Sequence, residues 1–173
     1  MKRFIKITCV LSAVFLLLTG CGSDNISKAE EEKIASSLSQ GFDVKAVIRM
    51  GEIKAQADIN RTKDGTSTVK ITNPKNLSGL TFSFDNENVT VSFLGLSLKL
   101  DNEKVLNSAM SKAVISSINK VSTPHGVSFE TKDGNLIANG ETESGKFELV
   151  LNSKDYSLLS LSVPDLDLEC TFR

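Results

Sequence analysis

The chain has 173 residues and a formal net charge of −1, with 40% hydrophobic and 24% charged residues. This composition is that of a globular protein, and it excludes disorder or a collagen-like repeat for the chain as a whole. There is no basic excess to indicate a nucleic-acid partner, and the length fits one domain, with or without a targeting segment.

The first twenty residues have the pattern of an export signal. Lys2, Arg3 and Lys6 are followed by an apolar run over residues 7–18, which ends at Thr19-Gly20-Cys21. The run is too short to span a bilayer comfortably. A charged start, an apolar middle and small residues at the end predict a secretory signal peptide over residues 1–20.

The end of this segment, Leu18-Thr19-Gly20-Cys21, resembles the lipobox of bacterial lipoproteins. The resemblance implies that the chain is cut before Cys21 and that this cysteine carries diacylglycerol and acyl chains such as palmitate. Two chains on one residue hold a protein stably on a membrane. The expected location is the extracytoplasmic face of the cell membrane. The alternative is an ordinary signal peptide with a chance cysteine at its end.

Removal of residues 1–20 changes the charge and cysteine counts. Three basic residues leave and no acidic ones, so the remainder has 17 Lys and Arg against 21 Asp and Glu, a formal −4. Cys9 leaves and Cys21 is used for the lipid, so Cys170 remains alone and no intrachain disulfide is predicted. Residues 21–26 form the lipidated cysteine and a tether of at most about 18 Å.

A first helix is predicted after the tether. Ser27 and Glu30 have capping-box spacing, Ile34 and Leu38 share a face, and Gly41 ends the helix. Apolar residues then alternate with polar ones between turn signals, which predicts antiparallel strands with one apolar face. These strands are expected near residues 42–50, 53–60, 69–71, 80–84, 89–93 and 96–100, and again near 127–129, 147–151, 159–163 and 166–172.

Between these two sets of strands the apolar spacing becomes helical. The pattern predicts a principal helix over residues 102–121, with Asp101 or Asn102 as its N-cap and Ile115 as an apolar exception on its polar side. About ten strands at ~4.8 Å give an open sheet roughly 48 Å wide, and one helix is only ~10–12 Å across. An open flat sheet would expose too much apolar surface, so we expect it to curl around the helix.

The predicted fold class is therefore mainly β (α+β): a curled antiparallel sheet of about ten strands, an unclosed barrel, wrapped on one internal helix, with a short N-terminal helix. Residues 27–173 are expected to form a single domain. This order of elements resembles the LolA/LolB-like superfamily, including mycobacterial lipoproteins of the LppX/LprG type. The segment Asn73-Pro74-Lys75-Asn76-Leu77-Ser78-Gly79-Leu80, with the later Gly95-Leu96, is also similar to lipoproteins of low-GC Gram-positive bacteria.

The resemblance implies a hydrophobic ligand, since LolA-like proteins carry acylated proteins or lipids in an apolar cavity and have no signature catalytic residues. Two hypotheses stay open: a lipid-binding or lipid-shuttling lipoprotein, and an anchored interaction module with a packed core and no ligand. The residues expected to line a cavity, or to fill the core, are Phe82, Phe84, Phe93, Met110, Val114, Ile118, Phe129 and Phe147.

The residues give little support for catalysis or a resident cofactor. His125 is the only histidine, and we interpret it as a loop residue without catalytic partners. One histidine and one mature cysteine do not make a usual zinc site. Asp165, Asp167 and Glu169 are predicted to form a solvated outer face of the last strand, and Cys170 a small buried hydrophobe. No enzyme activity, metal or non-covalent cofactor is expected.

Overall fold

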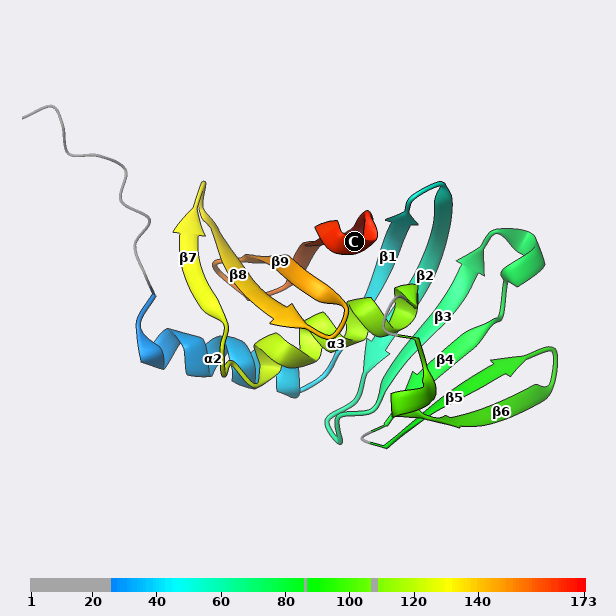
Figure 1. The fold of residues 1–173 in the computed structure, drawn as a ribbon. Helices are drawn as coiled ribbons and strands as arrows, with labels where there is room; N and C mark the ends of the chain where they lie inside the picture. The colour runs from blue at the N-terminus through cyan, green and yellow to red at the C-terminus, as the bar shows by residue number, and fades with distance from the viewer. Residues whose placement is uncertain (1–25, 86, 107–108) are drawn as a thin grey trace, which may run out of the picture.

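The structure is a computed structural model that describes residues 26–85, 87–106 and 109–173. In these ranges it contains one eleven-stranded antiparallel sheet and two α-helices (Figure 1). The helices are α2 (Lys28–Ser39) and α3 (Met110–Ser122). The strands are β1 (Phe42–Met50), β2 (Ile53–Arg61), β3 (Ser67–Asn73), β4 (Thr81–Phe84), β5 (Asn88–Phe93), β6 (Leu96–Asp101), β7 (Ser128–Lys132), β8 (Asn135–Thr142), β9 (Gly145–Asn152), β10 (Leu158–Val163) and β11 (Leu168–Phe172).

The sheet is built from two meanders that meet in its middle. Its order is β6-β5-β4-β3-β2-β1-β11-β10-β9-β8-β7, so every strand except β1 and β11 lies beside its sequence neighbours alone. The two meanders join where β1 pairs antiparallel with β11, with Ile48 opposite Cys170. The edge strands β6 and β7 do not pair in the described structure, and α3 connects them (Figure 1). The unclosed, mainly β fold class predicted from the sequence is thus confirmed.

The N-terminal helix α2 begins and ends as its sequence predicts. The Ser27 hydroxyl accepts a hydrogen bond from the Glu30 amide at 3.3 Å, which satisfies one of the free N–H groups at the helix start. Ile34 and Leu38 are buried. Gly41 has φ of +96°, and a Cβ there would lie 2.6 Å from the Arg61 carbonyl oxygen. Only glycine therefore fits this turn into β1.

The internal helix is shorter than predicted. α3 begins at Met110 with Ala109 as its N-cap, so the expected start at residue 102 is wrong. Asp101 instead caps a 3-10 turn, η3 (Asn102–Lys104), by accepting a hydrogen bond from the Glu103 amide at 3.1 Å. The chain then leaves the helical region at Val105, which has an extended backbone. Residues 102–106 continue the helical spacing of the apolar residues, but their backbone forms a 3-10 turn and then becomes extended at Val105.

The polar side predicted for α3 is also partly wrong. Ile115, the expected exception, is only 3% exposed. The reason is that α3 packs against strands β8 and β9 and also against α2, so it is covered from two directions. Buried positions consequently extend around most of the helix and include Ser111, Lys112 and Ser117.

The strand count is eleven rather than about ten, because the prediction from sequence missed β8. Its residues Leu136, Ile137 and Ala138 are all buried in succession and do not alternate. A short continuous apolar run is typical of a strand covered on both faces, and it gives no period-two signal. α3 packs against β8 and covers one of its two faces.

Candidate functional site

The candidate site lies on the inner face of the sheet, the face on which α3 packs. One row of paired residues crosses five strands of this face: Ile59, Val69, Phe82, Val91 and Leu98. Ile59 and Val69 are fully buried, Phe82 and Val91 are half-buried, and Leu98 is 59% exposed. Along this row the inner face is apolar, and it becomes progressively uncovered toward the edge strand β6.

An apolar cavity of about 150 Å³ lies where the covered part of this face meets the open part. Apart from Ser111 every lining residue is apolar, so it is suited to a hydrocarbon group rather than to a polar ligand. Strands β1–β4, the 3-10 turn η2 (Lys75–Leu77) and the start of α3 form its wall. The lining residues are Ile48, Ile53, Ala55, Val69, Ile71, Leu77, Leu80, Phe82, Met110 and Ser111.

The eight residues predicted to line a cavity separate into three groups. Phe82 and Met110 line the cavity. Phe93 is half-buried near the end of β5, opposite Leu96. The other five are buried in the core and do not border the cavity: Phe84, Val114, Ile118, Phe129 and Phe147.

The prediction missed the residues that form the open side of the site. Ile53 and Leu77 line the cavity while remaining 56% and 39% exposed, and Leu98 extends the same apolar surface onto β6. Strand alternation placed Ile53 and Leu98 on the apolar face, but it gives no signal for which members of that face stay uncovered. Leu77 lies outside the alternation altogether, in η2.

A second, polar groove of about 860 Å³ lies on the other side of α3. Its walls come from the β4–β5 turn, η3 and the β8–β9 turn, and its floor from α3. Five carboxylate residues and two lysines are among those that line it: Glu87, Asp101, Glu103, Glu141 and Glu143, with Lys112 and Lys120.

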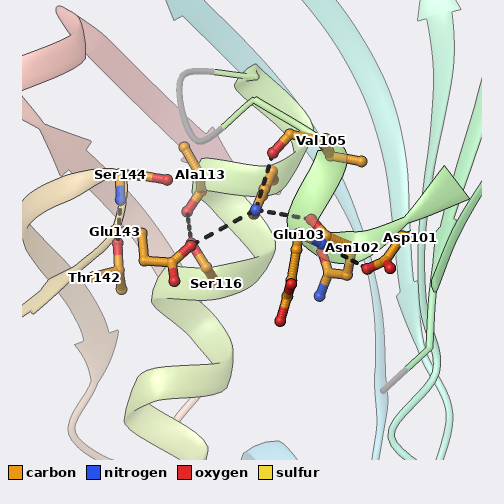
Figure 2. A network of polar contacts seen from close by, with 10 residues as sticks. Asp101, Asn102, Glu103, Val105, Ala113, Ser116, Thr142, Glu143 and Ser144 are labelled. Carbon is orange, nitrogen blue, oxygen red and sulfur yellow. Dashed lines mark hydrogen bonds and ion pairs between the residues drawn. The ribbon is translucent and has the colours of Figure 1, made fainter. Parts of the chain in front are cut away.

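Lys112 connects the two walls of this groove, and Figure 2 shows its partners Asn102 and Val105 on one wall and Glu143 on the other. Its Nζ donates hydrogen bonds to the carbonyl oxygens of Asn102 and Val105, both at 3.0 Å. It also lies 3.7 Å from Glu143 Oε2 in the β8–β9 turn. Lysine is almost never buried without partners, and here its amine ties the segment after β6 to α3 and to the opposite half of the sheet.

The described residues contain no group of three or more His, Cys, Asp and Glu side chains that could hold a metal ion. The predicted acidic row is not one face of a strand. Asp165 belongs to the 3-10 turn η4 (Pro164–Leu166), Asp167 has φ of +48°, and only Glu169 lies in β11. Pro164 begins this turn, so the last strand starts at Leu168 rather than at residue 166.

Cys170 is buried, as predicted, at 1% exposure. Desolvation in the core raises the pKa of its thiol from 9.0 to about 12. A thiol with so high a pKa forms almost no thiolate, which is the reactive species, at neutral pH. Cys170 is therefore a packing residue of the β1–β11 junction.

The predicted signal peptide, Cys21 and the start of the tether lie outside the described residues. In the part of the chain that the structure describes, neither helix is long and apolar enough to cross a membrane.

Comparison with known proteins adds information on the fold alone. No family model and no curated protein sequence matches the chain. Its structure is similar to an uncharacterised conserved protein from Thermus thermophilus, with a TM-score of 0.54 and 10% identity over 84% of this chain and 85% of that one.

Two further matches have lower scores. A LolA superfamily protein, NE2245 from Nitrosomonas europaea, gives a TM-score of 0.44 at 13% identity, with 79% of this chain and 70% of that one covered. A chain in the structure of the CwlD amidase from Clostridioides difficile in complex with the GerS lipoprotein gives 0.42 at 13% identity, with 82% and 88% covered. The sheet order itself, open between β6 and β7, confirms the unclosed antiparallel sheet predicted from the sequence.

Proposed function

We propose that the protein is a membrane-anchored extracytoplasmic lipoprotein that binds, and could shuttle, a lipid or another hydrophobic ligand between the curled sheet and α3. The single observation that carries this proposal is the apolar inner face of the sheet, part of which stays exposed at Ile53, Leu96 and Leu98 and which leads into the cavity at Met110. Soluble domains usually cover such a continuous apolar surface, and an uncovered one marks a binding site.

The size of the cavity limits how the ligand binds. Ligand pockets for small molecules usually measure about 300–1,000 Å³, and the cavity here measures about 150 Å³. It encloses only the end of an acyl chain. The rest of the chain would lie along the row from Phe82 to Leu98, where each buried CH₂ group contributes about 0.8 kcal/mol.

Binding of a fluorescent fatty acid, the probe, tests for a site that takes a hydrophobic ligand. Met110→Trp fills the cavity and is expected to abolish probe binding without loss of folding. Met50→Trp is the matched control, because Met50 is a half-buried inner-face methionine of β1 that does not line the cavity. The proposal is wrong if the unmodified protein does not bind the probe, or if both variants bind it equally well. Native mass spectrometry of the purified protein would identify a retained ligand.

The anchor needs its own experiment, since Cys21 lies outside the described residues. We expect the unmodified protein to incorporate labelled palmitate and to partition into the detergent phase after Triton X-114 separation. Cys21→Ser should lose the label. Equal labelling of the two proteins would exclude this cysteine as the lipidation site.

The alternative is an anchored interaction module without a ligand, and the small cavity favours it. Five of the eight predicted cavity residues are packed core, as this hypothesis requires. This alternative would be supported if the purified protein carries no ligand by native mass spectrometry and does not bind the fluorescent fatty acid.

A further inference from the structure

The exposed apolar side chains gather at one end of the sheet. Since neighbouring strands are antiparallel, the β1–β2, β3–β4 and β5–β6 connections lie at the same end, along the right of Figure 1. Of the six large apolar residues that are exposed in the described chain, four lie in or next to these connections, and Leu98 follows Leu96 on the same face of β6; the sixth is Leu106. We name the first five the apolar rim: Ile53, Leu77, Leu94, Leu96 and Leu98.

The tip of the β5–β6 hairpin is built in an unusual way. Leu94 and Gly95 form its two-residue turn, with φ of +52° and +82°. Two-residue turns with positive φ at both positions strongly prefer Asn-Gly, and a branched aliphatic side chain at positive φ is strained. Leu94 is nevertheless 85% exposed and Leu96 78% exposed. Neither side chain contributes much burial to the fold, so an apolar surface outside the chain would account for both.

The charge around the rim differs from that of the rest of the chain. Residues 67–84 and 88–100, which hold β3, η2, β4, β5 and most of β6, contain Lys70, Lys75 and Lys99 and no acidic residue, whereas the turn between them contains Asp85 and Glu87. Lys54 follows Ile53 at the start of β2, and Glu52 is the one acidic residue of the β1–β2 connection. The turns at the other end of the same strands contain three acidic residues, Asp64, Asp85 and Glu87, against one lysine, Lys63.

We propose that the apolar rim docks on a lipid bilayer that contains anionic headgroups. Leu94 and Leu96 would enter the interfacial layer, and the exposed Lys54 and Lys75 would lie at the level of the phosphates. Symmetric docking of a second copy is disfavoured, because it would bring these lysines against one another.

The proposal deepens the proposed function and rests on it for the membrane anchor. Ile53 and Leu77 belong both to the rim and to the wall of the cavity. The mouth of the cavity therefore faces the bilayer when the rim is docked, and an acyl chain moves from the membrane to Met110 without crossing water.

A site-specific fluorescent label tests the docking. The full chain with Cys9→Ser and Cys21→Ser has Cys170 as its one remaining cysteine, and that thiol is buried. An environment-sensitive dye is then attached at Leu94→Cys or, as the control, at Lys63→Cys in the exposed β2–β3 turn of the opposite end. Both proteins have the same N-terminal segment, so a difference between the labels reports the orientation of the sheet.

The probe membrane is a vesicle of phosphatidylglycerol and phosphatidylcholine with nitroxide-labelled lipid. We expect a blue shift and quenching at position 94 and none at position 63, with a weaker response on pure phosphatidylcholine. Equal responses at the two positions, or none at either, overturn the proposal. A blue shift without vesicles, together with a doubled mass in solution, shows self-association and also overturns it.

A second variant separates docking from ligand binding. Leu94→Asn suits the turn and is expected to remain folded; with the dye at Leu96→Cys it should lose most of the quenching. The same variant without dye should still bind the fluorescent fatty acid, because Leu94 does not line the cavity. Unchanged quenching would contradict docking through Leu94, whereas failure of the probe in the unmodified protein would contradict only the ligand-binding function.

Discussion

The two halves of the sheet have the same apolar alternation and different surroundings. In β9, the inner-face residues Phe147, Leu149 and Leu151 are buried in the core, on the side of the sheet where α3 packs. In β6, the inner-face residues Leu96 and Leu98 follow the same period and are largely exposed. The alternation decides which face of a strand is apolar, and the position of α3 decides whether that face becomes buried core or stays exposed.

The sharpest way to break this comparison is to truncate one leucine in each half. Leu149→Ala removes a fully buried side chain and is expected to lower the free energy of unfolding by about 2–5 kcal/mol. Leu98→Ala on the open edge should change it by less than about 0.5 kcal/mol. Urea denaturation measures both, and similar losses would mean that β6 is as well covered as β9.

The second largest loss of stability is expected at Lys112, which connects the two halves of the sheet. Lys112→Met leaves two carbonyl oxygens without their donor and is expected to cost about 1–3 kcal/mol. Glu143→Gln removes only the partner that is 76% exposed and should cost less than about 1 kcal/mol. Denaturation midpoints compare the two variants. If Glu143→Gln were the more damaging change, the ion pair rather than the two hydrogen bonds would hold the halves together.

The hairpin tip offers a change that should stabilise the protein. Leu94→Asn places at positive φ a residue that tolerates it, and relief of the strain is worth about 1 kcal/mol. The melting temperature should rise, whereas Leu149→Ala and Lys112→Met are expected to lower it. A lower melting temperature would show that Leu94 makes a packing contribution within the fold.

The smallest effect is expected at Cys170 near neutral pH. Iodoacetamide should not modify this thiol until urea unfolds the protein, because it is buried and protonated. Its folded pKa of about 12 lies above the free value of 9.0. The stability gained from burying the neutral thiol is therefore complete below pH 9.0 and is lost as the pH rises toward 12. Cys170→Ala should remove that part of the pH dependence, and rapid alkylation of the folded protein would show that the β1–β11 junction opens.

The predictions from sequence succeeded where local order carries the information. The capping of α2 by Ser27, the buried pair Ile34 and Leu38, and the period-two strands from β1 to β6 follow from spacing along the chain. They failed where contacts from elsewhere override spacing. Residues 102–109 have helical apolar spacing, yet Asp101 caps a separate 3-10 turn and Lys112 binds the carbonyl oxygens of Asn102 and Val105.

The sequence alone determined the fold class, the apolar face of each alternating strand and the scarcity of residues for catalysis. Only the tertiary structure decided that Phe82 and Met110 line a cavity while Phe84, Val114, Ile118, Phe129 and Phe147 are core. The same holds for the apolar rim around Leu94. The physical reason is that periodicity is a property of neighbouring residues, whereas coverage depends on how far one short helix reaches across eleven strands.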